Sequence, residues 1–175
     1  LGTLRESAKE SKRADIIIVS KTPNLNAQAK QKTLEDLSLK RHQQAYFSII
    51  KYQKYKSLKN DTELNDLQEY NITLVTGIAN PNPLIQHLKE KEIKFNLIKF
   101  IDHHNYTEKD IEKILLAHKK NKSVKKLILT TEKDATKLRR FIPNFTQKIY
   151  YIAIKVKIDK NQKFNKQVLD HVRES

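Results

Sequence analysis

The sequence predicts an α/β protein built on a parallel sheet with flanking helices, and three observations point to this class. Short β-branched runs alternate with helical patterns between residues 71 and 140. The runs at 71–76 and 126–131 are rich in Ile, Leu, Val and Thr, which is typical of buried strands of a parallel sheet. Hydrophobic residues make up 38% of the 175 residues and are spread along the chain, so one sizeable core can form.

The first part of the chain predicts fewer and less regular elements. Residues 15–20 form a β-branched run, so we expect a strand buried on both faces, although residues 1–14 before it are polar. Residues 26–42 predict a polar helix. From residue 46 to residue 55 the apolar period changes to two, which predicts a half-exposed strand, and residues 56–70 are expected to form a surface connection.

The second part predicts a regular succession of elements. Strands are expected at 71–76, 95–101 and 126–131, and helices at 83–91, 107–119 and 132–141. Thr107, followed three residues later by Asp110, is expected to cap the middle helix as an imperfect capping box. Residues 148–158 alternate like a half-exposed strand, and a short helix is expected over 164–173.

Composition excludes several kinds of site. The chain has no Cys, which excludes a disulfide framework, a thiolate metal site and a cysteine nucleophile. Its two glycines, Gly2 and Gly77, are too far apart for a Gly-rich phosphate loop. No apolar run approaches the roughly 18 residues of a membrane span. The chain begins at Leu1 and contains no Met, so we expect a processed chain or a fragment of a longer product.

The net charge of +15 comes from 35 Lys plus Arg against 20 Asp plus Glu. Most of the excess is Lys scattered among Asn and Ile, as in AT-rich genomes, and no cluster of Arg with aromatic residues appears. Base recognition favours such clusters, so we expect no nucleic-acid partner. Attraction to an anionic membrane surface or to a phosphorylated substrate remains an interpretation of the charge.

Ligands of parallel sheets bind at the carboxyl ends of the strands, which selects three segments: 76–81, 101–104 and 130–134. We expect them to meet at one edge of the sheet. Within the second segment, Asp102 can orient an adjacent imidazole, and histidine titrates near neutral pH. His103 and His104 are adjacent and should point to different sides, so we expect no zinc site. The alternative is a polar turn before the next helix.

The other two segments also have simple structural explanations. Thr131 is a good N-cap, and Glu132 and Asp134 suit the start of a helix without any further role. Gly77 is expected either to adopt a positive φ or to allow close approach of a ligand. The remaining histidines lie in polar helical stretches and are expected at the surface: His42, His87, His118 and His171.

Taken in order, these segments resemble one family. The motifs are Leu-Gly-Thr-Leu-Arg-Glu at 1–6, Arg-Ala-Asp-Ile-Ile-Ile-Val-Ser-Lys at 13–21, Thr-Gly-Ile-Ala-Asn-Pro at 76–81, Phe-Ile-Asp-His-His-Asn-Tyr at 100–106 and Leu-Thr-Thr-Glu-Lys-Asp at 129–134. Each motif is weak alone, but their succession resembles the C-terminal half of the tetraacyldisaccharide 4′-kinases, the lipid A 4′-kinases of Gram-negative bacteria.

This resemblance implies a two-domain P-loop kinase whose smaller C-terminal domain has a Rossmann-like parallel sheet with flanking helices. Residues 1–45 would be a remnant of the P-loop kinase domain, and 46–55 a linker strand. Residues 56–147 would form the small α/β domain, and 148–175 a returning linker strand with a terminal helix. The P-loop would precede Leu1, so the fragment alone is expected to be inactive.

The resemblance also implies an activity, cofactors and partners. Members transfer the γ-phosphate of ATP, with Mg²⁺, to the 4′-hydroxyl of tetraacyldisaccharide 1-phosphate, which gives lipid IVA in lipid A biosynthesis. They are peripheral proteins at the cytoplasmic face of the inner membrane. The expected partners are therefore the lipid substrate, the N-terminal kinase half of the same protein and the anionic membrane surface.

The family's site residues carry over to matching positions. Its Asp-His pair falls on Asp102 and His103, with His103 expected to support the catalytic aspartate of the other domain. Its Arg-Glu pair falls on Arg5 and Glu6, which would contact the nucleotide, with Glu6 also holding Mg²⁺ or its waters. Ser7 stands where proline is usual, a local departure. By position, Thr76 and Gly77 would line the cofactor cleft.

Two other functional classes stay open from the residues alone. One is a stand-alone α/β module that binds a nucleotide or nucleic acid, and the other is a glycosyltransferase-like domain with its substrate at the strand ends. The upstream coding sequence would separate them, because a kinase gene continues into a Gly-rich phosphate loop.

Overall fold

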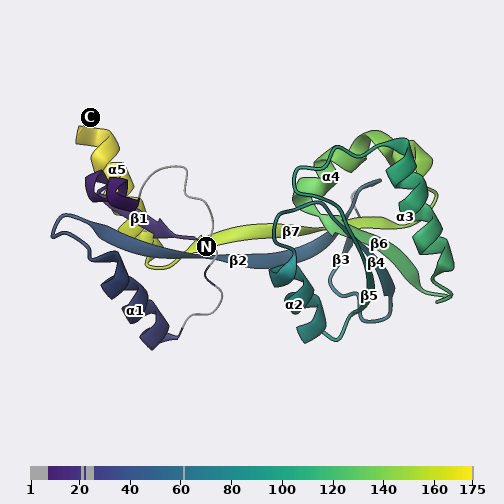
Figure 1. Ribbon diagram of the computed structural model, residues 1–175, viewed down its shortest axis with the longest axis horizontal. Coiled ribbons are helices and arrows are strands. Elements are labelled where there is room, and N and C mark those ends of the chain that lie inside the picture. Colours follow the sequence, from purple (N-terminus) through teal and green to yellow (C-terminus); the bar gives the residue numbers. More distant parts are fainter. Residues whose placement is uncertain (1–7, 21, 23–25, 61, 175) are drawn as a thin grey trace. The chain divides into compact units, whose positions relative to one another are not determined.

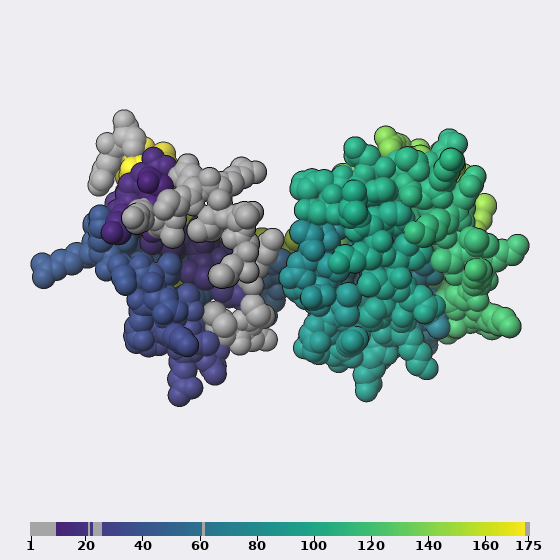
Figure 2. Space-filling view, in the orientation of Figure 1, coloured from purple at the N-terminus to yellow at the C-terminus, as the bar shows by residue number. Residues whose placement is uncertain are grey.

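The structure is a computed structural model that describes residues 8–20, 22, 26–60 and 62–174 (Figure 1). The chain divides into two compact units: residues 1–51 with 155–175, and residues 52–154. Figure 2 shows the first unit mainly in purple and blue and the second in teal and green.

The first unit joins a short parallel strand pair to helices. β1 (Ile16–Val19) pairs with β2 (Gln44–Ser57) in parallel, and Ile16 lies opposite Gln44. Tyr46 of β2 is buried, and its ring meets the edge of Phe164 at 5.1 Å. The other elements of this unit are η1 (Ala8–Arg13), α1 (Ala27–Leu37) and α5 (Asn161–Glu174).

Burial of the strand near residue 15 on both faces is not seen among the described residues. Within the described residues β1 stands at the end of the strand order, beside β2. Its side chains are partly exposed, and Ile18 is 44% exposed. A β-branched run therefore predicted the strand correctly, whereas burial depends on neighbours that the run itself does not specify.

The second unit contains the parallel sheet that the sequence predicted. Its strand order is β7 (Ile149–Ile158), β6 (Lys126–Thr131), β4 (Asn71–Thr76) and β5 (Lys94–Lys99), and each neighbouring pair is parallel. The helices are α2 (Asn82–Glu90), α3 (Glu108–Lys120), α4 (Glu132–Leu138) and the 3₁₀ segment η2 (Arg139–Asn144).

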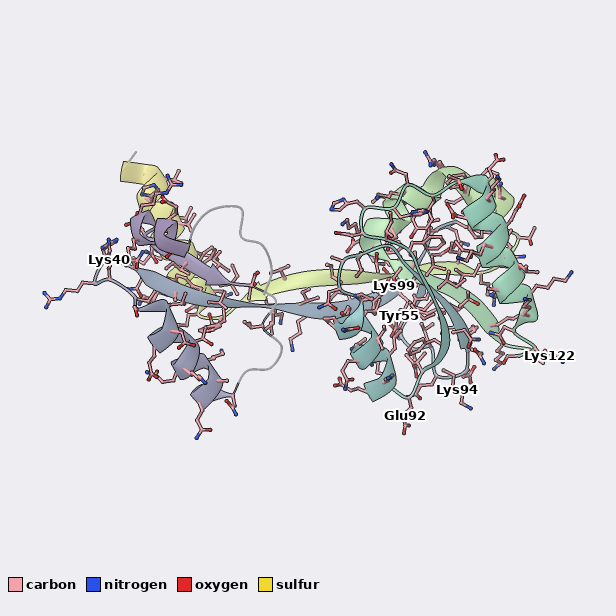
Figure 3. The ribbon with its side chains drawn as sticks, in the orientation of Figure 1. Lys40, Tyr55, Glu92, Lys94, Lys99 and Lys122 are labelled. Carbon is pink, nitrogen blue, oxygen red and sulfur yellow. The ribbon has the colours of Figure 1, made fainter. Side chains whose placement is uncertain are left out.

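Each face of this sheet has its own core, because β-strand side chains alternate between faces. On one face Leu74 and Leu129 pack with Leu84 and Leu88 of α2. Tyr55 belongs to this core as well, and Figure 3 labels it within the unit. The opposite core contains Val75 and Ile128 of the strands, together with Ile111 and Ile114 of α3 and Ala135 and Leu138 of α4. The strands β4 and β6 therefore lie between two packed clusters of apolar side chains.

β2 and β7 each pass from one unit into the other, since the unit boundaries fall within both strands. They run antiparallel: the N–H of Leu58 donates to the carbonyl of Ile149, and the N–H of Asp159 donates to that of Phe47. The connection expected over 56–70 contains a short strand, β3 (Glu63–Leu64), which pairs with β2. The expected division of the chain at residues 45, 55 and 147 stays a prediction.

Among the described residues no helix is long and apolar enough to cross a membrane.

Candidate functional site

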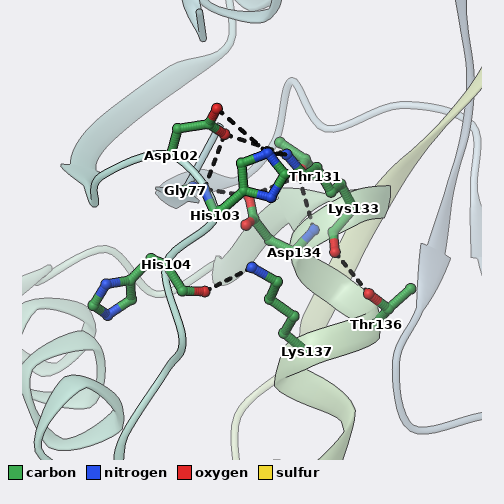
Figure 4. A network of polar contacts seen from close by, with 9 residues as sticks. All are labelled: Gly77, Asp102, His103, His104, Thr131, Lys133, Asp134, Thr136 and Lys137. Carbon is green, nitrogen blue, oxygen red and sulfur yellow. Dashed lines mark hydrogen bonds and ion pairs between the residues drawn. The ribbon is translucent and has the colours of Figure 1, made fainter. Parts of the chain in front are cut away.

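Three segments meet at the carboxyl edge of the second unit's sheet, as the sequence predicted. The N–H of Gly77, after β4, donates to Oδ2 of Asp134 at 2.9 Å. Lys133 at the start of α4 donates from Nζ to Oδ1 of Asp102, after β5, at 3.2 Å. Figure 4 shows these contacts in one network. The β4, β5 and β6 ends are therefore tied together by side chains that follow them directly.

Asp102, His103 and Lys133 form the exposed part of this network. His103 Nε2 lies 3.7 Å from Asp102 Oδ2 and 3.4 Å from Lys133 Nζ. The His103 side chain is 75% exposed, whereas that of Asp102 is 36% exposed. An imidazole that is open to a ligand and flanked by one carboxylate and one ammonium can accept, hold or donate a proton.

Asp102 is held in its charged form. Partial desolvation raises its pKa, but the hydrogen bond from Lys133 and the one from the His103 N–H outweigh it, so the pKa of Asp102 lies below its ordinary value. That backbone N–H donates to Oδ1 at 2.9 Å. His103 itself has φ 57, in the left-handed region that non-glycine residues rarely adopt.

His104 faces the opposite way and is built into the protein. Its ring stacks on Phe100 with a centroid separation of 4.6 Å and meets the edge of Tyr106 at 5.1 Å. Its Nε2 lies 2.9 Å from Oδ2 of Asp110 on α3. The expectation that the two adjacent histidines point to different sides is confirmed (Figure 4). Of the two rings, that of His103 is the exposed one.

Gly77 lies where the chain has no room for a side chain. It does not have a positive φ, so that alternative was wrong. A Cβ at this position would lie 2.9 Å from Asp134 Oδ1 and 3.0 Å from the hydroxyl of Tyr106. Close approach is therefore the reason for the glycine, and the approaching groups are the protein's own. Its N–H already donates to Asp134, so Gly77 has no free backbone donor with which to bind a cofactor.

The structure adds long-range contacts to two residues that the sequence explained as ordinary helix-start acids. Asp134 is fully buried and accepts from Thr131 Oγ1 at 2.7 Å as well as from Gly77. Burial, followed by the charge of Asp134, raises the pKa of Tyr106. Glu132 accepts from the N–H of Ile154 in β7 at 3.0 Å. Local capping was therefore an incomplete explanation for both.

The remaining predicted residues are placed as follows. Arg5 and Glu6 lie outside the described residues. Thr76 is fully buried at the end of β4. His118 is 5% exposed, so the prediction of a surface position was wrong for it. His42 and His171 are exposed, and His87 is half-buried against Tyr52.

Within the described ranges no group of three His, Asp or Glu side chains could hold a metal ion. The expected Mg²⁺ contact falls on Glu6, which lies outside the described residues, so it stays a prediction.

Sequence reasoning missed the cations of α4 and η2. Lys133 contacts Asp102, and Lys137 donates to the carbonyl of His104 at 2.8 Å. Arg140 donates to the carbonyl of Tyr106. Their spacing of four and three residues places them on one helix face, a signal that the sequence does contain.

Comparison with known proteins gives a consistent result. Residues 1–173 match the family of tetraacyldisaccharide-1-P 4′-kinases. The tetraacyldisaccharide 4′-kinase of Bacteroides thetaiotaomicron is 35% identical over 99% of this chain and 50% of its own length. That of Flavobacterium johnsoniae is 30% identical over 99% of this chain and 49% of its own length. The chain thus spans about half the length of the curated relatives it matches.

A solved structure agrees at the level of the fold. LpxK from Aquifex aeolicus, crystallised in complex with ATP, superimposes with a TM-score of 0.59 at 20% identity, over 97% of this chain and 46% of that one. The separate binding module and the glycosyltransferase-like domain gain no support from these matches. Motif order, fold and sequence similarity over nearly the full length agree: the chain belongs to the tetraacyldisaccharide-1-P 4′-kinase family.

Proposed function

We propose that this chain is part of an ATP-dependent kinase that phosphorylates the 4′-hydroxyl of tetraacyldisaccharide 1-phosphate to give lipid IVA. The family match over residues 1–173 supports this assignment. One observation within the chain carries it: an exposed imidazole, His103, stands beside a carboxylate at the carboxyl edge of a parallel sheet. Phosphoryl transfer to an alcohol requires that the hydroxyl proton be removed, and an imidazole at a strand end can assist the group that accepts it.

In the proposed reaction the hydroxyl oxygen bonds to the γ-phosphorus of ATP while the bond from that phosphorus to ADP breaks. The hydroxyl proton must leave as the new bond forms. His103 supports the carboxylate that takes this proton, which belongs to the remainder of the kinase. Asp102 stabilises the protonated form of the His103 ring and limits the orientation of that ring. It does both because its carboxylate lies against the side chain and accepts from the backbone N–H of His103.

The nucleotide contacts of this chain remain proposals. We assign Arg5 and Glu6 to the Mg²⁺–ATP side of the site, where the carboxylate would hold the ion or its waters and the guanidinium would face phosphate oxygens. Thr76 and Gly77 are both buried, so any role at the nucleotide cleft is to shape its wall from below the surface rather than to contact the nucleotide. Any role of Gly77 is then steric rather than hydrogen bonding, since Asp134 occupies its N–H.

We also propose a place of action and two further partners. An acylated disaccharide resides in a membrane, so the kinase has to work at a membrane surface, in this case the cytoplasmic face of the bacterial inner membrane. The net charge of +15 favours an anionic lipid surface. The remaining partner is the nucleotide-binding half of the kinase, which the relatives' greater length accommodates.

The assignment of His103 is tested by substitution in the intact kinase. His103→Ala is expected to lower kcat by about 100-fold or more, since general acid–base catalysis contributes on that order. His42→Ala is the matched control, because that side chain is exposed in the first unit. His104→Ala is expected to lower kcat less and to reduce thermal stability, since it removes the packing on Phe100. Unchanged turnover of lipid in His103→Ala would overturn the assignment.

A further inference from the structure

Three cations on one side of α4 and η2 bind the segment 100–106, called here the Asp102 loop. Lys133 donates to the Asp102 carboxylate, Lys137 to the carbonyl of His104 and Arg140 to the carbonyl of Tyr106. These cations, the cationic stripe, follow the helical spacing of four and three residues. They bind every second residue of the loop, at positions 102, 104 and 106. Figure 4 shows the two lysine contacts.

The residue between the first two anchors is the one with an unusual backbone. His103 has φ 57, and a side chain other than glycine adopts that region at an energetic cost. Such a conformation persists only where the surroundings enforce it. Anchors on both neighbours, Asp102 and His104, meet that requirement. Its imidazole is meanwhile largely exposed, so burial of the ring contributes little to holding it in place.

We propose that the cationic stripe is a positioning device that holds His103 in its left-handed conformation and presents the imidazole at a fixed point of the sheet edge. Lys137 shows the principle most clearly, because it binds a backbone carbonyl of the loop rather than a side chain. Lys133 adds a second effect, since its ammonium binds the Asp102 carboxylate directly. The positioning of His103 does not depend on the function proposed above, whereas an expected change in kcat rests on it.

The test compares three variants of the intact protein. Lys137→Met removes the donor but retains side-chain length, Lys137→Arg restores a donor, and Lys122→Met is the control. Lys122 is exposed on the connection after α3, where Figure 3 labels it. The first measurement is backbone ¹⁵N relaxation of residues 101–106, which needs neither ATP nor lipid. The second is kcat and KM for the lipid substrate.

Lys137→Met is expected to increase fast backbone motion at His103, with recovery in Lys137→Arg and no change in Lys122→Met. The kcat of Lys137→Met should fall roughly tenfold with KM nearly unchanged, because a misplaced group affects the transition state more than binding. Increased motion with full turnover would support the positioning and count against the catalytic role of His103. Unchanged backbone motion would overturn the proposal, whatever the turnover.

A second variant keeps the proposal testable if Lys137→Met folds poorly. Lys133→Gln retains a hydrogen-bond donor but removes the charge, so the pKa of Asp102 should rise toward its ordinary value of 3.8. Carboxyl ¹³C titration measures this directly. If the pKa of Asp102 is the same in Lys133→Gln as in wild type, Lys133 does not act on the Asp102 loop. The proposal that Lys133 anchors this loop would then be refuted.

Discussion

His118 is the histidine that the core of the second unit encloses. Its Nδ1 lies 3.2 Å from the hydroxyl of Thr73, and both residues are buried. Burial lowers the pKa of His118, and the nearby charge of Lys126 lowers it further. The folded chain therefore resists protonation of this ring more than the unfolded chain does, because its pKa lies below the ordinary value of 6.5.

This difference predicts a pH-dependent loss of stability. As pH falls below about 6.5 the unfolded chain binds a proton that the folded chain resists, so the free energy of unfolding decreases. The loss should grow until the pH reaches the lowered folded pKa. We expect wild type to lose more stability than His118→Gln between pH 7.5 and pH 5.5 in urea unfolding. His87, whose pKa is also lowered, is present in both proteins, so its effect cancels.

An equal pH dependence in the two proteins would contradict this prediction. The example also shows where residue-level prediction fails. His118 lies near the end of a polar helix, among Lys119 and Lys120, and its neighbours in sequence indicate exposure. Burial comes from β4, which is far away along the chain and supplies Thr73. An expectation based only on the polarity of neighbouring residues cannot predict the contact of His118 with Thr73.

At the scale of elements, α3 begins with a complete capping box. The hydroxyl of Thr107 accepts from the N–H of Asp110 at 3.4 Å, and Asp110 Oδ2 accepts from the N–H of Thr107 at 2.8 Å. The sequence indicated an imperfect box, because aspartate is shorter than the usual glutamate or glutamine. The structure shows that the shorter side chain completes it. The same carboxylate oxygen also meets His104.

The cap predicts a measurable contribution to stability. Thr107→Ala removes the hydroxyl and should lower the free energy of unfolding by about 1 kcal/mol, as is typical of N-cap losses. Thr107→Ser keeps the hydroxyl and serves as the control, with little change expected. Chemical denaturation measures both. If Thr107→Ala unfolds at the same denaturant concentration as wild type, the cap does not contribute to the stability of the fold.

The elements that the sequence predicted best are those with the strongest local signal. The strands at 71–76 and 126–131 were predicted with their observed bounds, because runs rich in Ile, Leu, Val and Thr end at Gly77 and at an N-cap threonine. The parallel order also placed the candidate segments at one edge. The contacts across that edge were less predictable, because they join residues that are distant in sequence. They are the hydrogen bond between Gly77 and Asp134 and the one between Lys133 and Asp102. Resemblance to a family found the Asp-His pair but gave no indication of its lysine neighbours.

At the scale of the whole molecule, the two units differ in how they are packed. In the second unit β4 lies between β5 and β6, and its residues Ile72, Leu74 and Val75 are fully buried. In the first unit β1 stands at the end of the strand order, and its side chains are partly exposed. Local opening requires less free energy where fewer apolar groups are buried. The units should therefore open independently, the first more often.

Hydrogen exchange on the 175-residue chain measures this difference directly. Amides of 72–75 are expected to exchange at least about 100-fold more slowly than those of 16–19, since central strands open only with the whole unit. Residues 127–130 of β6 are the internal control and should be protected like β4, because they are equally buried. Equal protection of β1 and β4 in a monomeric sample would contradict the prediction. If the nucleotide-binding half covers the first unit, exchange at 16–19 should slow in the intact kinase while that at 72–75 stays the same.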